Sequence, residues 1–147
     1  MGRSVRFAIV ALALLAFGCG NDTVTSPNAQ GLAGTWQATR AVYVNAADTT
    51  VSYDVVAKGG TATLVLTANT FTLTIAGAGV APQVTSGTWT STTDLMTLNP
   101  SGVSFQWVFE MSQSGNNLTL NGASVEFDFT GDGINEQAKL NLALVRA

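Results

Sequence analysis

The sequence contains no histidine and one cysteine, Cys19, among its 147 residues. Catalytic units of the Ser/His and Cys/His kinds and zinc sites depend on these side chains, so their scarcity argues against all three. A single cysteine cannot form an intramolecular disulfide. Lysine and arginine number six against nine aspartates and glutamates, and they are widely scattered. The chain therefore lacks the basic patch that nucleic-acid binding requires. Because the side chains of the common catalytic units are scarce, we also expect a protein that is not an enzyme.

Residues 1–18 have the features of a secretory signal peptide. Arg3 and Arg6 supply a positive start, and an uninterrupted apolar run from Phe7 to Phe17 follows it. The run is shorter than the roughly 20 residues that a membrane-spanning helix needs. We therefore expect this segment to be removed from the mature chain.

The apolar run leads into residues 15–19, LAFGC, which resemble a bacterial lipobox. The resemblance implies cleavage before Cys19, acylation of its thiol and anchoring in a membrane, since several acyl chains give stable attachment. The alternative is a chance cysteine beside an ordinary secretory cleavage site. Gly20 stands where an inner-membrane retention signal would have aspartate. We expect a lipid-anchored protein of the bacterial cell envelope, in the outer rather than the inner membrane if the host is Gram-negative.

Residues 19–31 are polar, contain Pro27 and read as the lipidated cysteine and a flexible tether. Residues 32–147 then form one domain rich in Thr, Val, Leu and aromatics, with turn residues recurring roughly every eight to twelve positions. No ten-residue window shows a helical period. The pattern predicts about ten strands: 35–45, 51–56, 61–67, 71–75, 84–90, 95–98, 103–111, 117–120, 124–129 and 137–146.

Most of these segments alternate apolar and polar residues. Along 103–111, the side chains of Val103, Phe105, Trp107, Phe109 and Met111 fall on one face. Such alternation is typical of antiparallel sheet with one side in water. Hairpin-linked strands without a crossover helix predict an all-β, up-and-down barrel of about 8–10 strands. A β-sandwich made of the same strands is the alternative.

One short motif at the start of the first strand resembles a known family. Gly34-Thr35-Trp36 is similar to the Gly-x-Trp that opens the first strand of the calycins, which include the lipocalins. In that group an arginine from the end of the last barrel strand packs across the tryptophan ring and closes the barrel. Arg146 ends the last strand here, on its apolar face. The resemblance implies a bacterial lipocalin-like lipoprotein domain in which Gly34, Trp36 and Arg146 close the barrel.

A hollow barrel interior would favour ligand binding, and a filled interior would favour a structural or interaction role. A row of aromatic side chains forms either a packed core or the wall of a ligand cavity. Its members are Phe105, Trp107, Phe109, Phe127 and Phe129, of which the first four are the candidates for a ligand cavity. Arg40 shares the parity of Trp36 and would join a cavity as an inward cation, or else lie at the rim. We expect a binding module for a small hydrophobic ligand, or alternatively a structural or interaction lipoprotein with a filled interior.

The segment from Asp128 to Glu136 resembles a calcium-binding loop of the Asp-x-(Asp/Asn)-x-Asp-Gly type. The resemblance implies oxygen ligands from Asp128, Thr130, Asp132, the carbonyl of Ile134, and Glu136. A calcium ion there would be structural. The alternative is a hairpin turn, because Gly-Asp-Gly is also turn chemistry between two good strands. We expect no other cofactor.

Overall fold

The computed structural model describes residues 31–79 and 81–147. The predicted signal peptide, Cys19 and nearly all of the tether lie outside the described residues. Within them the chain forms nine strands. The strands are β1 (Gly34–Asn45), β2 (Ser52–Asp54), β3 (Thr61–Leu66), β4 (Thr70–Ala76), β5 (Gln83–Ser91), β6 (Leu95–Pro100), β7 (Trp107–Ser114), β8 (Asn117–Phe127) and β9 (Glu136–Arg146).

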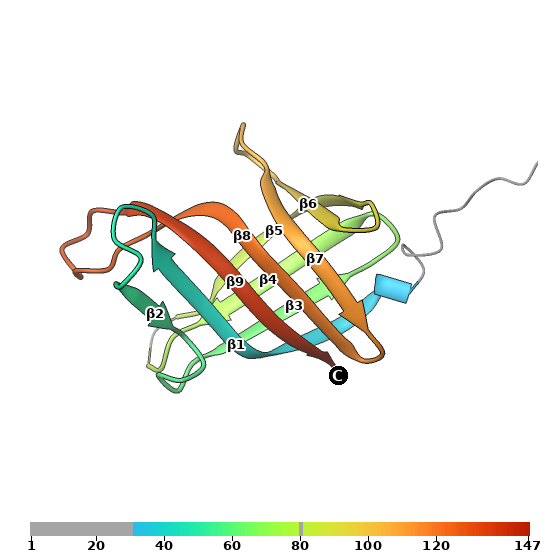
Figure 1. The fold of residues 1–147 in the computed structure, drawn as a ribbon, viewed down its shortest axis with the longest axis horizontal. Helices are drawn as coiled ribbons and strands as arrows, with labels where there is room; N and C mark the ends of the chain where they lie inside the picture. Colours follow the sequence, from blue (N-terminus) through green and yellow to red (C-terminus); the bar gives the residue numbers. More distant parts are fainter. Residues whose placement is uncertain (1–30, 80) are drawn as a thin grey trace, which may run out of the picture.

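Eight of these strands, all except β2, form one closed antiparallel barrel (Figure 1). From β3 to β9 each strand pairs with the next one along the chain. The ladder between β1 and β9 closes the barrel, from Trp36 opposite Arg146 to Asn45 opposite Ala138. This confirms the predicted up-and-down barrel. The sandwich alternative is wrong, because closure leaves no two separate sheets to pack face to face.

Strand β2 lies at a seam in the barrel wall. β1 pairs with β3 only from Gly34 to Gln37, after which the two strands separate. The second half of β1 pairs instead with β2, from Val42 opposite Asp54 to Val44 opposite Ser52. β2 thus supplies partners for a stretch of β1 that β3 does not reach.

The barrel interior is filled by inward side chains of alternating residues. Removing one such side chain from water is worth about 1.5–3 kcal/mol, so this cluster accounts for much of the stability of the fold. Trp89 belongs to it and donates its indole N–H to the Thr67 carbonyl at 3.1 Å. The largest fully buried side chains are Trp36, Phe71, Phe109, Leu32, Leu64, Leu73, Met96, Leu98, Leu118, Leu120, Leu140 and Leu142.

Two strand predictions need correction. The segment predicted as one strand over 103–111 becomes regular only at Trp107, and Phe105 lies in the preceding loop with 52% of its surface exposed. The segments 117–120 and 124–129 belong to a single strand, β8, which ends at Phe127. Asn121-Gly122 is typical of a turn, but here it forms a β-bulge, with Gly122 at a φ of 84°.

The two ends of the barrel differ. Short turns connect β3 to β4, β5 to β6 and β7 to β8 at the end that carries Trp36 and Arg146, which we call the closed end. Longer loops connect β1 to β2, β4 to β5, β6 to β7 and β8 to β9 at the opposite end, which we call the mouth (Figure 1). In the part of the chain that the structure describes, no helix is long and apolar enough to cross a membrane.

Candidate functional site

The closed end is built around Trp36. Its side chain is fully buried, and its indole N–H donates to the Leu32 carbonyl at 2.8 Å. The Arg146 guanidinium carbon lies 4.3 Å from the ring centroid, so the contact that the calycin resemblance implies is present. A cation over an indole face is worth roughly 0.5–2 kcal/mol, depending on how far it is removed from water.

Arg146 also ties the entering chain to the barrel. Its Nη1 donates to the Ala33 carbonyl at 2.9 Å, and its Nη2 donates to the Gly31 carbonyl. Gly34 makes room for this arrangement: a Cβ there would lie 2.5 Å from Arg146 Nη1, and its φ is 140°. Its backbone conformation favours glycine, and an added Cβ would also force the Arg146 guanidinium to shift.

A cavity of about 230 Å³ opens at the mouth, away from Trp36. Strands on both sides of the barrel contribute to its wall, and so do the loops that precede β7 and β9. Of the four aromatics predicted to line a cavity, Phe105 and Trp107 line this one. The lining residues are Tyr43, Leu73, Ile75, Gln83, Thr85, Phe105, Trp107, Val125, Glu126, Asn135 and Leu140.

A second compartment of about 180 Å³ shares Tyr43, Ile75 and Gln83 with the first. Phe127 lines it and stacks on Tyr43, with ring centroids 4.2 Å apart. Phe127 also contacts Tyr53 of β2, at 5.2 Å between centroids. Burial raises the pKa of Tyr43 to about 12, so its phenol is a neutral hydrogen-bonding group at physiological pH.

The remaining predicted cavity residues lie elsewhere. Phe109 is fully buried in the core below the cavity. Arg40 does not point inward: its side chain is 69% exposed and pairs with Asp54 at 3.4 Å. The cause is a register shift between Ala38 and Arg40 in the ladder of β1 with β9. A bulge reverses the inward parity of everything that follows it, so the parity of Trp36 does not extend to Arg40.

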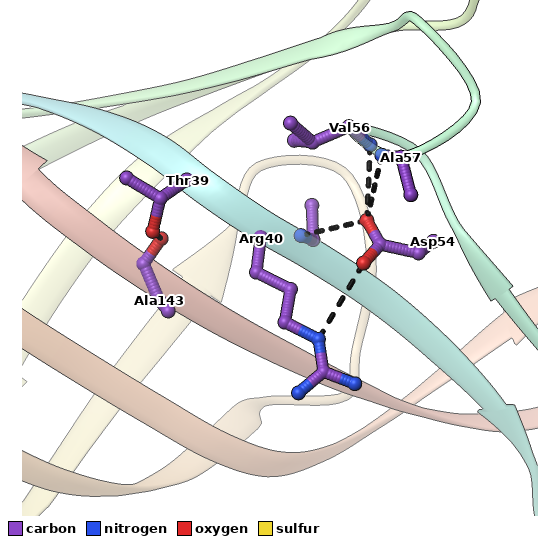
Figure 2. A network of polar contacts seen from close by, with 7 residues as sticks. Thr39, Arg40, Asp54, Val56, Ala57 and Ala143 are labelled. Atoms are coloured by element: carbon purple, nitrogen blue, oxygen red, sulfur yellow. Dashed lines mark hydrogen bonds and ion pairs between the residues drawn. The ribbon is translucent and has the colours of Figure 1, made fainter.

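Sequence reasoning missed Asp54, which organises the seam (Figure 2). Its Oδ1 accepts hydrogen bonds from the backbone N–H groups of Val56 at 3.1 Å, Ala57 at 3.2 Å and Ala41 at 3.4 Å. Its Oδ2 pairs with Arg40. The available signal was an aspartate at the start of a turn, since such a carboxylate accepts from backbone groups two and three residues on. Asp54 thus holds β2 and its turn against β1.

Trp107 differs from Trp36 and Trp89 in the hydrogen bonding of its indole N–H. Its indole nitrogen is buried and has no hydrogen-bond partner among the described residues. A buried donor without an acceptor costs about 1–3 kcal/mol. Trp107 lines the mouth cavity, so the one orphaned side-chain donor found in the described residues belongs to a cavity wall.

The loop from Asp128 to Glu136 is held by hydrogen bonds from its backbone N–H groups to its own carboxylates. Asp128 Oδ1 accepts from the N–H groups of Thr130 at 3.1 Å and Gly131 at 2.6 Å, and its Oδ2 accepts from Gly133 at 2.8 Å. These bonds, led by the one from Gly133, hold the pKa of Asp128 below its usual value. The carboxylate of Glu136 accepts from Phe129 N–H at 3.0 Å.

Three of the predicted calcium ligands, Asp128, Asp132 and Glu136, accept hydrogen bonds from backbone N–H groups of the loop. Among residues 31–79 and 81–147 there is no group of three or more His, Cys, Asp or Glu side chains placed to hold a metal ion. Asp132 accepts from the Ile134 N–H at 2.8 Å. The loop is thus a turn held by its own hydrogen bonds, and calcium binding by it stays a hypothesis.

No family model and no curated protein sequence matches the chain. Among solved structures, the chain is similar to lobster apocrustacyanin A1, a lipocalin, with 14% sequence identity and a TM-score of 0.46. The alignment covers 84% of this chain and 64% of that one, so this chain spans less than two thirds of the length of its structural neighbour. A likeness at this identity concerns the fold alone, and the barrel assignment stands on the strand pairing described above.

Proposed function

We propose that this barrel is a non-catalytic binding module that holds a small hydrophobic ligand in its mouth. The observation that carries the proposal is the cavity of about 230 Å³ at the end away from Trp36. Aromatic and aliphatic side chains form much of its wall, and a few polar groups such as Gln83 and Thr85 stand among them. Concave sites of this composition are the usual form of small-molecule sites in proteins.

The size of the cavity limits the ligand. Sites for drug-sized molecules span roughly 300–1,000 Å³, and each compartment of the mouth is smaller than that. Below the mouth the barrel is filled by side chains such as Phe109, Met96 and Leu120. The ligand is therefore compact, and a long acyl chain has no room to extend toward the closed end.

Native mass spectrometry of the protein purified from its host membrane, followed by lipid extraction, tests the proposal. We expect a bound small molecule that is lost in Thr85→Phe, because Thr85 lines the cavity and a phenyl ring would fill it. Val84→Phe is the matched control, since Val84 is the neighbouring residue and is 64% exposed. Absence of any bound species, or equal retention in both variants, would contradict the proposal.

A second function is supported by how much of the interior is filled. Trp36, Phe71 and Phe109 are fully buried, and the core cluster runs from the closed end to the floor of the mouth. A structural or interaction lipoprotein needs such a stable barrel and no ligand. The same mass-spectrometric experiment separates the two functions, because this one predicts no bound species in the wild type.

We further propose that the barrel is anchored through a lipidated Cys19 in the bacterial cell envelope, in the outer membrane if the host is Gram-negative. The support is the sequence pattern of residues 15–19. Cys19→Ala should move the protein from the membrane fraction to the soluble fraction of host cells. Retention of that variant in the membrane fraction would refute lipid anchoring.

A further inference from the structure

Trp107 is the residue of the cavity wall whose hydrogen bonding is incomplete. It shares the inward parity of Phe109 and Met111 on β7, and its ring packs against the core cluster. The side chain as a whole is partly exposed, but its Nε1 atom is buried and has no partner within residues 31–79 and 81–147. The nitrogen therefore lies on the interior side of the ring and not at its exposed edge.

The barrel offers this nitrogen no acceptor of its own. In the part of the chain that the structure describes, no polar or charged residue belongs to the buried core on which the Trp107 ring packs. An indole N–H donates a hydrogen bond and never accepts one, whereas the amide and hydroxyl groups of Gln83, Thr85 and Asn135 in the same wall do both. A molecule in the cavity is thus the available partner, and it must bring an acceptor.

Among the described residues, neither compartment of the mouth has an inward charged side chain. Glu126 borders the main cavity, but it is exposed and lies with Ser124 on the outer face of β8, where its Oε1 accepts from Gln137 at 3.2 Å. The neighbouring Val125 and Phe127 face inward. The four Lys and Arg residues of the described chain are absent from both walls. A buried ion of either sign would lack a partner, which is costly.

From this combination we propose that the mouth selects a compact neutral molecule with an apolar body and an acceptor oxygen, such as a cyclic ketone, ester or lactone, and that Trp107 donates to that oxygen. The inference rests on the proposed function and names the chemical class of its ligand. The apolar body lies against side chains such as Leu73 and Ile75. Since Nε1 is closed to water, the oxygen reaches it through a small turn of the ring, which a partly exposed side chain allows more readily than a fully buried one.

Three probes with one ring system and different polar groups test the inference: indane, 1-indanone and indane-1-carboxylate. Isothermal titration calorimetry compares their binding to the purified protein and to Trp107→Phe. The variant keeps a ring and loses the N–H, so it should weaken 1-indanone about tenfold and indane by less than about twofold. Comparing the two probes across the two proteins cancels their unequal hydration. The carboxylate should bind weakest, because the wall has no cation to pair with it.

Trp89→Phe is the matched control, since the Trp89 N–H already donates to the Thr67 carbonyl and the side chain lines neither compartment. It should leave the binding of both neutral probes unchanged. Equal weakening of indane and 1-indanone in Trp107→Phe, or the same loss in Trp89→Phe, would overturn the role of the N–H and leave the binding function intact. Carboxylate binding tighter than that of 1-indanone would overturn the neutral class.

The molecule that copurifies with the protein separates this inference from the proposed function. A copurified molecule that is charged, or that has no acceptor oxygen, would overturn the inference and support the function. Failure of all three probes to bind, together with no copurified molecule, would overturn both.

A second measurement does not depend on whether Trp107→Phe folds. In a protein labelled with ¹⁵N-tryptophan, the indole N–H resonance of Trp107, assigned through nuclear Overhauser contacts, should move downfield with 1-indanone and stay in place with indane. The resonances of Trp36 and Trp89 should not move with either probe, because both N–H groups already have carbonyl partners. An unmoved Trp107 resonance in the presence of bound 1-indanone would overturn the inference.

Discussion

Two tryptophans at opposite ends of the same barrel have different environments. Trp36 at the closed end is fully buried, donates its N–H to Leu32 and lies under the guanidinium of Arg146. Trp107 at the mouth is partly exposed, borders a cavity and has an indole N–H without a partner. The closed end satisfies its polar groups internally, whereas the mouth leaves one unsatisfied.

This difference shows where the barrel is stable and where it can bind. Short turns and the regular pairing of β1 with β9 from Trp36 to Ala38 order the closed end. At the mouth, longer loops carry half-exposed side chains such as Phe105 around a hollow interior. Ligand sites are commonly drawn from the less stable parts of a fold, which is consistent with a functional mouth and a structural closed end.

Truncation of the two tryptophans should produce the largest difference in stability between the two ends. Trp36→Ala should lower the free energy of unfolding by about 3–5 kcal/mol, because it leaves a large cavity in a packed core. Trp107→Ala should cost about 1–2 kcal/mol, because its ring is partly exposed and its N–H is already unpaired. Urea unfolding measures both. If Trp36→Ala does not fold, Trp36→Phe should still cost more than Trp107→Phe, since only the former loses a hydrogen bond.

The glycines of the two ends provide a second comparison. Gly34→Ala should destabilise the protein by about 2–3 kcal/mol, because its backbone is strained for alanine and the new methyl group would displace Arg146. Gly131→Ala should cost about 1 kcal/mol, because φ is 74° but nothing lies within 4 Å of the added atom. Equal losses in urea unfolding would show that the contact with Arg146 contributes nothing at Gly34.

The arginine at the closed end can be tested against a lysine near the mouth. Arg146→Met should cost about 1–2 kcal/mol in urea unfolding, through loss of the ring contact and of two bonds to backbone carbonyls. Lys139→Met should change stability by less than about 0.5 kcal/mol, because its partner Ser124 is exposed. An effect of Lys139→Met as large as that of Arg146→Met would contradict the view of the closed end as the stabilising region.

The smallest effect concerns the loop at the mouth. Asp128 has a lowered pKa in the folded state, so its contribution to stability is complete above the ordinary aspartate pKa of about 3.9 and is lost as the pH falls through the lowered value. Asp128→Asn removes the acceptor for Gly133, and its melting temperature should be below that of the wild type at pH 7. The difference should shrink toward pH 3; a constant difference would contradict the assignment.

Calcium provides a separate test of the same loop. Because the carboxylate of Asp128 is occupied by backbone N–H groups, neither a chelator nor added calcium should change the melting temperature of the wild type. A ligand that binds only the folded state raises its stability by mass action. A rise in melting temperature with calcium that Asp128→Asn abolishes would therefore restore the calcium-loop interpretation.

Much of the fold could be predicted because antiparallel strands have a strict period of two. Parity along the last strand was enough to place Arg146 on the face of Trp36, since the ladder between them is regular at that end. The same reasoning points the Arg40 side chain inward, which is wrong, because an extra residue in β1 shifts the register. No residue type near this position indicates the bulge. It also misplaced Phe105, which alternates with its neighbours but lies outside any ladder.

The class of fold follows from the residue pattern, because alternating apolar residues have few ways to be buried other than in a sheet with one wet face. The partners at the closed end follow from the calycin resemblance of Gly34-Thr35-Trp36 together with the parity of Arg146. The nature of the mouth depends on three-dimensional packing. Whether Trp107, Tyr43 and Ile75 form a packed wall or a cavity depends on loops, bulges and the seam held by Asp54, which bring distant segments together. Hollow space depends on packing among all these segments, and a linear pattern does not contain that information.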